Sequence, residues 1–210
     1  LKKEANYLKI LNPKMNELDN NIIIKIAKES LIKEIIKKEE LKKLIDLKEE
    51  NAFANQYFND VLLKLGYKDE IEFKKDLLKY DSYSLEEVKF KSKLEIYWND
   101  LIYNKYISKI DINKKKLEKK IKEIDLNDKK EIFLSEIVLK NEKNKENFQK
   151  LIDEIKSSIN KIGFSNTASV YSISESSKFG GKIGWFEKSN LSEKIYEKIK
   201  NLEINEFSEI

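Results

Sequence analysis

The sequence contains neither cysteine nor histidine, and it has one proline and five glycines among 210 residues. Without cysteine there is no disulfide framework, no thiolate nucleophile and no cysteine-based zinc site. Without histidine, the usual general base and the commonest metal ligand are both missing. Catalytic triads are therefore excluded, and we expect no metal and no other cofactor.

Arginine is also absent, so all 42 basic residues are lysines and the net charge is only +4. Arginine supplies the bidentate contacts to phosphate and guanine, and its absence argues against specific reading of DNA. A sequence rich in lysine, asparagine and isoleucine is also what an AT-rich genome encodes. We therefore expect no nucleic-acid partner.

Long apolar runs are missing too: none approaches the ~18 residues that would span a bilayer. We expect no membrane insertion. No secretory leader is visible, but the chain starts with leucine instead of methionine, which predicts a processed, trimmed or partly ordered fragment. Its N-terminus therefore does not indicate a cellular location.

The first half of the chain has the periodicity of helices. Apolar residues recur at helical spacing over residues 15–45 and 50–65, and capping signals at Asp69 and Ser84 open two more helices. The last of these helices carries the aromatic stripe Tyr97, Trp98 and Tyr106. Such a stripe indicates a hydrophobic core, or alternatively a groove that binds peptides.

After Asp125 the pattern changes. Residues 126–130 are polar and predict a domain joint, and residues 131–140 alternate as a strand does. A helix is predicted over 145–161, a shorter one over 164–171, and a serine-rich loop over 172–181. Four of the five glycines lie between Gly163 and Gly184. This clustering indicates positions where the backbone has a positive φ or where two backbone segments approach closely.

These residues resemble the parvulin family of prolyl isomerases over about residues 130–210. The matching residues, in order, are Gly163-Phe164, Ala168, Tyr171-Ser172, Gly180-Gly181 and Gly184-Trp185, followed by a helix over 191–202 and the turn Asn205-Glu206-Phe207-Ser208. The upstream helices are similar to the N-terminal module of SurA-type periplasmic chaperones. Their anchors are Ser30 to Glu34, the Leu65-Gly66 turn, and Trp98 with Leu101 and Ile102.

The resemblance implies an α+β fold. Residues 1–127 would form an all-helical chaperone module, and residues 128–210 a parvulin-like (FKBP-like) domain with a small antiparallel sheet. The glycine-dense hairpin before Trp185 would pair with the strand at Ile132 to Leu139. The family's last strand would follow residue 208, so we expect an incomplete sheet whose open edge contacts another chain.

The resemblance also implies where the site lies. The family's first-strand histidine falls at Glu136, and its loop cysteine or aspartate falls at Ser174. The proline pocket keeps leucine as Leu191 but has Ile195 in place of phenylalanine, and Trp185 covers the sheet. Because both catalytic positions, Glu136 and Ser174, are substituted, we predict weak or no isomerase activity.

The resulting hypothesis is a periplasmic, ATP-independent chaperone. No phosphate-binding loop is present, and the partners would be unfolded or extended polypeptides, mainly outer-membrane proteins. The parvulin domain would act mainly in binding. The alternative is a competent prolyl isomerase that tolerates the substitutions. A purely helical scaffold would be preferred if the region after Glu131 formed no sheet.

Overall fold

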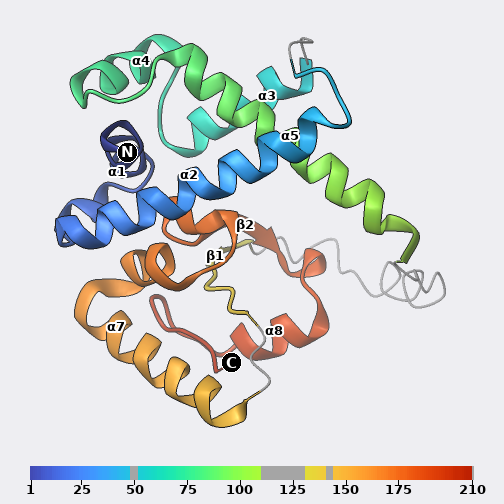
Figure 1. The fold of residues 1–210 in the computed structure, drawn as a ribbon. Coiled ribbons are helices and arrows are strands. Elements are labelled where there is room, and N and C mark those ends of the chain that lie inside the picture. Colours follow the sequence, from blue (N-terminus) through green and yellow to red (C-terminus); the bar gives the residue numbers. More distant parts are fainter. Residues whose placement is uncertain (48–51, 110–130, 141–143, 210) are drawn as a thin grey trace. The chain divides into compact units, whose positions relative to one another are not determined.

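The structure, a computed structural model, describes residues 1–47, 52–109, 131–140 and 144–209. Figure 1 shows the ribbon coloured along the sequence. The chain forms two compact units, each built from two separate stretches. Unit 1 comprises Leu1–Ile110 and Ile137–Gly181, and unit 2 comprises Asp111–Glu136 and Lys182–Ile210.

Unit 1 is helical. Its elements are α1 (Lys2–Leu11), η1 (Pro13–Glu17), α2 (Asn20–Lys42), α3 (Ala52–Lys64), α4 (Glu70–Lys79), α5 (Leu85–Tyr106), η2 (Ile107–Lys109), α7 (Lys145–Tyr171) and η3 (Glu175–Phe179). The helices predicted from residues 15 and 50 therefore begin at Asn20 and Ala52. Helix α1 has no counterpart among the predicted helices.

The two predicted capping signals are confirmed. The Ser84 hydroxyl accepts a hydrogen bond from the Glu87 backbone N–H, and the Glu87 carboxylate accepts one from the Ser84 N–H. Asp69 likewise accepts from the backbone N–H of Glu72 at the start of α4. Each of these bonds pairs a backbone N–H that finds no acceptor within the first turn of its helix.

Buried side chains of unit 1 form separate apolar clusters. One joins α1, α3, α4 and α5 around Phe58 and Phe73, both 1 % exposed. Another packs Tyr97 and Trp98 of α5 against Leu41, as the core interpretation of the aromatic stripe predicts. Tyr106, at the end of the same helix, is 44 % exposed and lies outside that cluster.

Helix α7 contains the break that the sequence predicts. Gly163 has φ 79° and ψ 161° inside the helix, so two helical stretches meet there at an angle. A side chain at this φ and ψ would be strained, which explains the glycine. Helix α7 packs against η1 and α2, and η3 packs against α1. In the second stretch of α7, Ser165 and Ser169 hydrogen-bond to Asn12, so part of the parvulin-like segment folds with the N-terminal helices.

Unit 2 holds the sheet. Its described elements are β1 (Glu131–Ser135), β2 (Lys182–Glu187), η4 (Lys188–Asn190) and α8 (Glu193–Ile199). An α+β fold with a small antiparallel sheet is confirmed. The purely helical scaffold was to be preferred only if the region after Glu131 formed no sheet, and this region does form one. The strand is shorter than the predicted 131–140, and the helix is shorter than 191–202.

Two predictions concern residues that the structure does not describe. The joint at residues 126–130, and with it the domain boundary at 127/128, lies outside the described ranges.

In the described part of the chain, no helix is both long and apolar enough to cross a membrane.

Candidate functional site

The sheet of unit 2 pairs the two segments on which the resemblance depends. Strands β1 and β2 are antiparallel, and Phe133 lies directly opposite Trp185. The register shifts between Leu134 and Ser135, where a bulge interrupts the ladder. The glycine-dense segment before Trp185 therefore returns to the strand that begins at Glu131, as predicted.

The exposure of the residues alternates along β1 and, from Gly184 onward, along β2, so the sheet has two different faces. Ile132, Leu134 and Phe186 are half-buried on one face. On the other face Phe133 is 44 % exposed and Trp185 is 66 % exposed. Their ring centroids lie 5.3 Å apart, with the ring planes at 73°.

We call Phe133 and Trp185 the aromatic pair. Edge-to-face packing between two rings stabilises this arrangement by about 1 kcal/mol. The rings stay accessible nonetheless, because each strand has solvent on this face. An exposed, rigid pair of aromatic rings is a surface on which an apolar or prolyl side chain can stack.

The two residues predicted to form the proline pocket differ in exposure. Leu191 is 8 % exposed and follows η4. Ile195 lies in the first turn of α8, whose N-cap Ser192 accepts a hydrogen bond from the Ile195 N–H, and its side chain is 50 % exposed. Ile195 is thus available to a ligand, while Leu191 is largely internal. Their joint action as a pocket stays a prediction.

Glu136 follows the last residue of β1 and has an intermediate exposure. It belongs to unit 2, whereas Ser174 belongs to unit 1. Ser174 is the N-cap of η3 and accepts a hydrogen bond from the Ser176 N–H. The catalytic role of either residue is not tested by this geometry.

The segment after Glu136 is tied to the loop that carries Ser174. Val138 donates its backbone N–H to the Ser172 hydroxyl at 3.0 Å, and its carbonyl accepts from the Ile173 N–H at 2.9 Å. These bonds replace the strand pairing that was predicted up to residue 140. They fix the start of the serine-rich loop.

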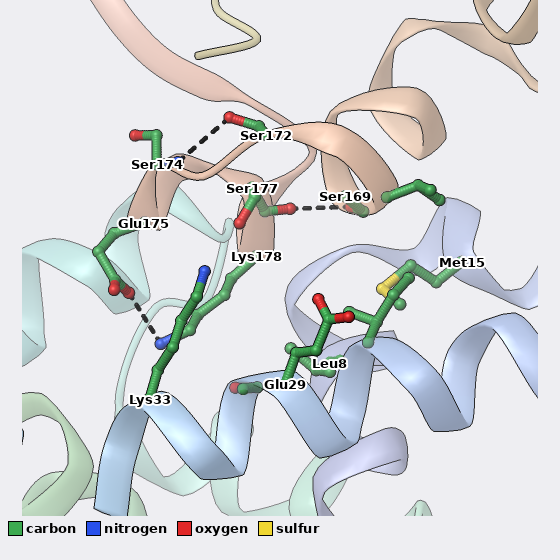
Figure 2. A pocket seen from close by; sticks show the side chains of 13 residues that line it. Leu8, Met15, Glu29, Lys33, Ser169, Ser172, Ser174, Glu175, Ser177 and Lys178 are labelled. Atoms are coloured by element: carbon green, nitrogen blue, oxygen red, sulfur yellow. Dashed lines mark hydrogen bonds and ion pairs between the residues drawn. The ribbon is translucent and has the colours of Figure 1, made fainter. Parts of the chain in front are cut away.

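Ser174 lines a small cavity in unit 1 (Figure 2). The walls come from α1, η1 and α2 on one side and from the serine-rich loop on the other, and they include Leu8, Met15, Glu29 and Lys33. The cavity volume is about 40 Å³, which is room for a few water molecules. Within unit 1, this cavity beside Ser174 therefore has room for small molecules of the size of water.

A closed ring of four charges anchors the same loop. Lys37 of α2 lies 2.6 Å from a Glu95 oxygen and 2.5 Å from a Glu175 oxygen. Lys178 lies 3.3 Å from Glu95 and 2.9 Å from Glu175. We call these four residues the ionic ring. Because it joins α2, α5 and η3, the loop is fixed to the helices of unit 1.

The ring also changes the acidity of its members. Burial alone would raise the pKa of Glu175, but Lys178 and Lys37 together lower it to about 2. Burial would lower the pKa of Lys178, yet Glu95 and Glu175 raise it above the ordinary range. Both shifts favour the charged forms, so Glu175 and Lys178 are ionised at neutral pH.

Sequence reasoning missed the ionic ring. A signal was present: Lys37 falls on the helix face defined by the buried residues Ile23, Ala27 and Leu41. A lysine at such a position requires an anionic partner. The partner in η3, however, is 138 residues away in the sequence, and periodicity alone cannot identify it.

Comparison with known families adds one finding. Residues 132–210 match the family described as "Rotamase: PPIC-type PPIASE domain". No curated protein and no solved structure matches the chain. The matched range starts in β1 and includes the Gly163 break, the serine-rich loop, the aromatic pair's Trp185 and α8. Residues 132–210 are a PPIC-type, parvulin peptidyl-prolyl isomerase domain.

Proposed function

We propose that this chain is an ATP-independent chaperone that holds extended, unfolded polypeptides, and that its PPIC-type domain acts mainly in binding. A domain of this family implies isomerase or peptide-binding function. The observation that carries the choice of binding is the aromatic pair. Phe133 and Trp185 offer exposed rings on a sheet face, while the chain contains no histidine at all.

Catalysis of prolyl rotation makes a stronger demand than binding. The amide barrier is about 18–20 kcal/mol, and an enzyme must favour the twisted amide over the planar one. That needs pre-organised polar groups around an enclosed proline. Here Ser174 stands where the family's loop cysteine or aspartate is expected, and Glu136 stands where its first histidine is expected. These features support binding over turnover.

Unit 1 supports the holding role with exposed apolar side chains of its own. On α2, Ile32, Ile35 and Ile36 are between 46 % and 58 % exposed. On α3 and α4, Phe53 and Leu78 are 77 % and 73 % exposed. Apolar side chains that stay in water give weak contacts at several points to an unfolded chain.

The clients that we propose are unfolded outer-membrane proteins in the periplasm. This part of the proposal comes from the similarity of residues 1–127 to SurA-type chaperones. Holding is measured by light scattering after an unfolded outer-membrane β-barrel protein is diluted from urea, without nucleotide. Suppressed scattering at stoichiometric chaperone is the expected result, and unchanged scattering would refute the holding role.

The aromatic pair predicts the effect of mutation on peptide binding. Replacing both Phe133 and Trp185 by alanine removes about 2 kcal/mol of stacking contact, so the affinity for an extended peptide should fall about thirtyfold. The matched control is Tyr103→Ala with Tyr106→Ala, since these rings are 61 % and 44 % exposed on α5. Calorimetric titration measures both double variants, and equal losses would contradict the assignment.

A competent prolyl isomerase is the second candidate, and the family match favours it directly. It predicts accelerated cis–trans exchange of a proline peptide by catalytic amounts of protein. The binding proposal predicts that exchange stays close to the uncatalysed rate while the peptide is bound.

A further inference from the structure

The exposed face of the sheet carries charge beside the aromatic pair. Glu131 lies directly opposite Glu187, one step along the same face from Phe133 and Trp185. Both glutamates are exposed. We call Glu131 and Glu187 the acidic pair. The Ser189 hydroxyl donates a hydrogen bond to Glu187 at 3.3 Å, but among the described residues neither carboxylate has an ion-pair partner.

Two like charges at directly opposed strand positions destabilise the sheet, because their Cβ atoms lie only about 5 Å apart. A cation placed between them would remove this repulsion. The chain's own charge makes the location distinctive, since 42 lysines give the whole protein a net charge of +4. Two carboxylates at opposed strand positions attract a basic ligand to this face.

We propose that this sheet face binds extended peptides in which a lysine or arginine lies two residues from the apolar residue that stacks on the aromatic pair. The inference rests on the proposed peptide-binding function and adds a preference for charge to it. Two residues along a strand span about 7 Å, the separation between the Phe133–Trp185 and Glu131–Glu187 positions. A peptide running along the strands would therefore present its basic side chain about two residues from its stacked residue.

The test uses fluorescence of Trp185. The chain has two tryptophans, and Trp98→Phe leaves Trp185 as the one reporter. Three peptides are titrated into this background, alike except for lysine, glutamine or glutamate two residues from a single phenylalanine. Since exposed ion pairs each contribute a few tenths to one kcal/mol, the lysine peptide should bind about threefold to tenfold more tightly than the glutamine peptide. The glutamate peptide should bind most weakly.

Matched variants separate charge at this face from net charge. Glu131→Gln with Glu187→Gln should abolish the preference and leave the affinity of the glutamine peptide unchanged. Glu193→Gln with Glu197→Gln changes the net charge equally on exposed positions of α8, and it should keep the preference. Raising the salt concentration should shrink the difference between peptides.

The remaining outcomes distinguish failure of the charge preference from failure of peptide binding itself. Equal affinity of all three peptides, or a preference that survives in the Glu131/Glu187 variant, would overturn the charge preference while leaving peptide binding intact. Failure of every peptide to bind would overturn the proposed peptide-binding function, and the charge preference with it.

Discussion

The ionic ring gives a quantitative prediction for Lys37→Met. The substitution keeps an unbranched apolar stem but removes the cation between Glu95 and Glu175. Breaking a buried ion pair costs about 3–5 kcal/mol and an exposed one less than about 1 kcal/mol. The Lys37 side chain is 8 % exposed, whereas the Glu95 and Glu175 side chains are 19 % and 40 % exposed. The ring lies between these limits, so we expect a loss of about 2 kcal/mol.

Equilibrium unfolding in urea, followed by circular dichroism, measures this loss. The control is Lys42→Met on the same helix, whose pair with Glu39 has side chains that are 49 % and 59 % exposed. That variant should lose less than about 0.5 kcal/mol. If Lys37→Met destabilised the protein no more than Lys42→Met does, the anchoring role of the ring would be refuted.

The same ring predicts a dependence on pH. The pKa of Glu175 is about 2 in the folded chain, below its ordinary 4.5. A depressed carboxyl pKa contributes stability that is fully present above pH 4.5 and lost as the pH falls toward 2. Lys37→Met removes one of the two cations that lower this pKa. The variant should therefore lose less stability than the wild type across that window.

Further substitutions test local features of the fold. Gly180 has φ +68°, and an added Cβ would lie 1.9 Å from the Ser165 Oγ, so Gly180→Ala should cost clearly more than the about 1–2 kcal/mol of a left-handed alanine. Gly66 has φ +88°, and no atom lies within 4 Å of a Cβ added there. Gly66→Ala should therefore cost only the about 1–2 kcal/mol of a left-handed alanine. Ser84→Ala should destabilise α5 by about 1 kcal/mol through loss of the capping bond to Glu87. Urea unfolding of the three variants checks all of these, and equal losses for Gly180→Ala and Gly66→Ala would contradict the clash with Ser165.

Much of the fold could be predicted because it depends on local patterns. The capping residues Asp69 and Ser84 start their helices as predicted, and Gly163 interrupts α7 where its backbone requires positive φ. The antiparallel pairing of β1 with β2 followed from the resemblance. Helix α1 was missed because it is short and rich in lysine, and its buried Glu4 breaks the apolar periodicity.

The site was less accessible to prediction because it depends on distant contacts. Trp185 was predicted to cover the sheet. Its edge-to-face contact with Phe133, however, arises from the register of the two strands, which the spacing of residues in the sequence does not specify. The ring that joins Lys37 to Glu175 closes across α2 and η3. The predicted strand stops at Ser135 because Val138 bonds to the serine-rich loop instead.

We predict that the PPIC-type domain binds peptides with weak or no turnover of their prolyl bonds. Exchange spectroscopy by NMR on one phenylalanine–proline peptide tests it, because a single sample reports both binding and cis–trans interconversion. We predict that peptide resonances shift on addition of the protein while no exchange cross-peaks appear beyond the uncatalysed rate. Cross-peaks as strong as those produced by an active parvulin at the same concentration would contradict the claim.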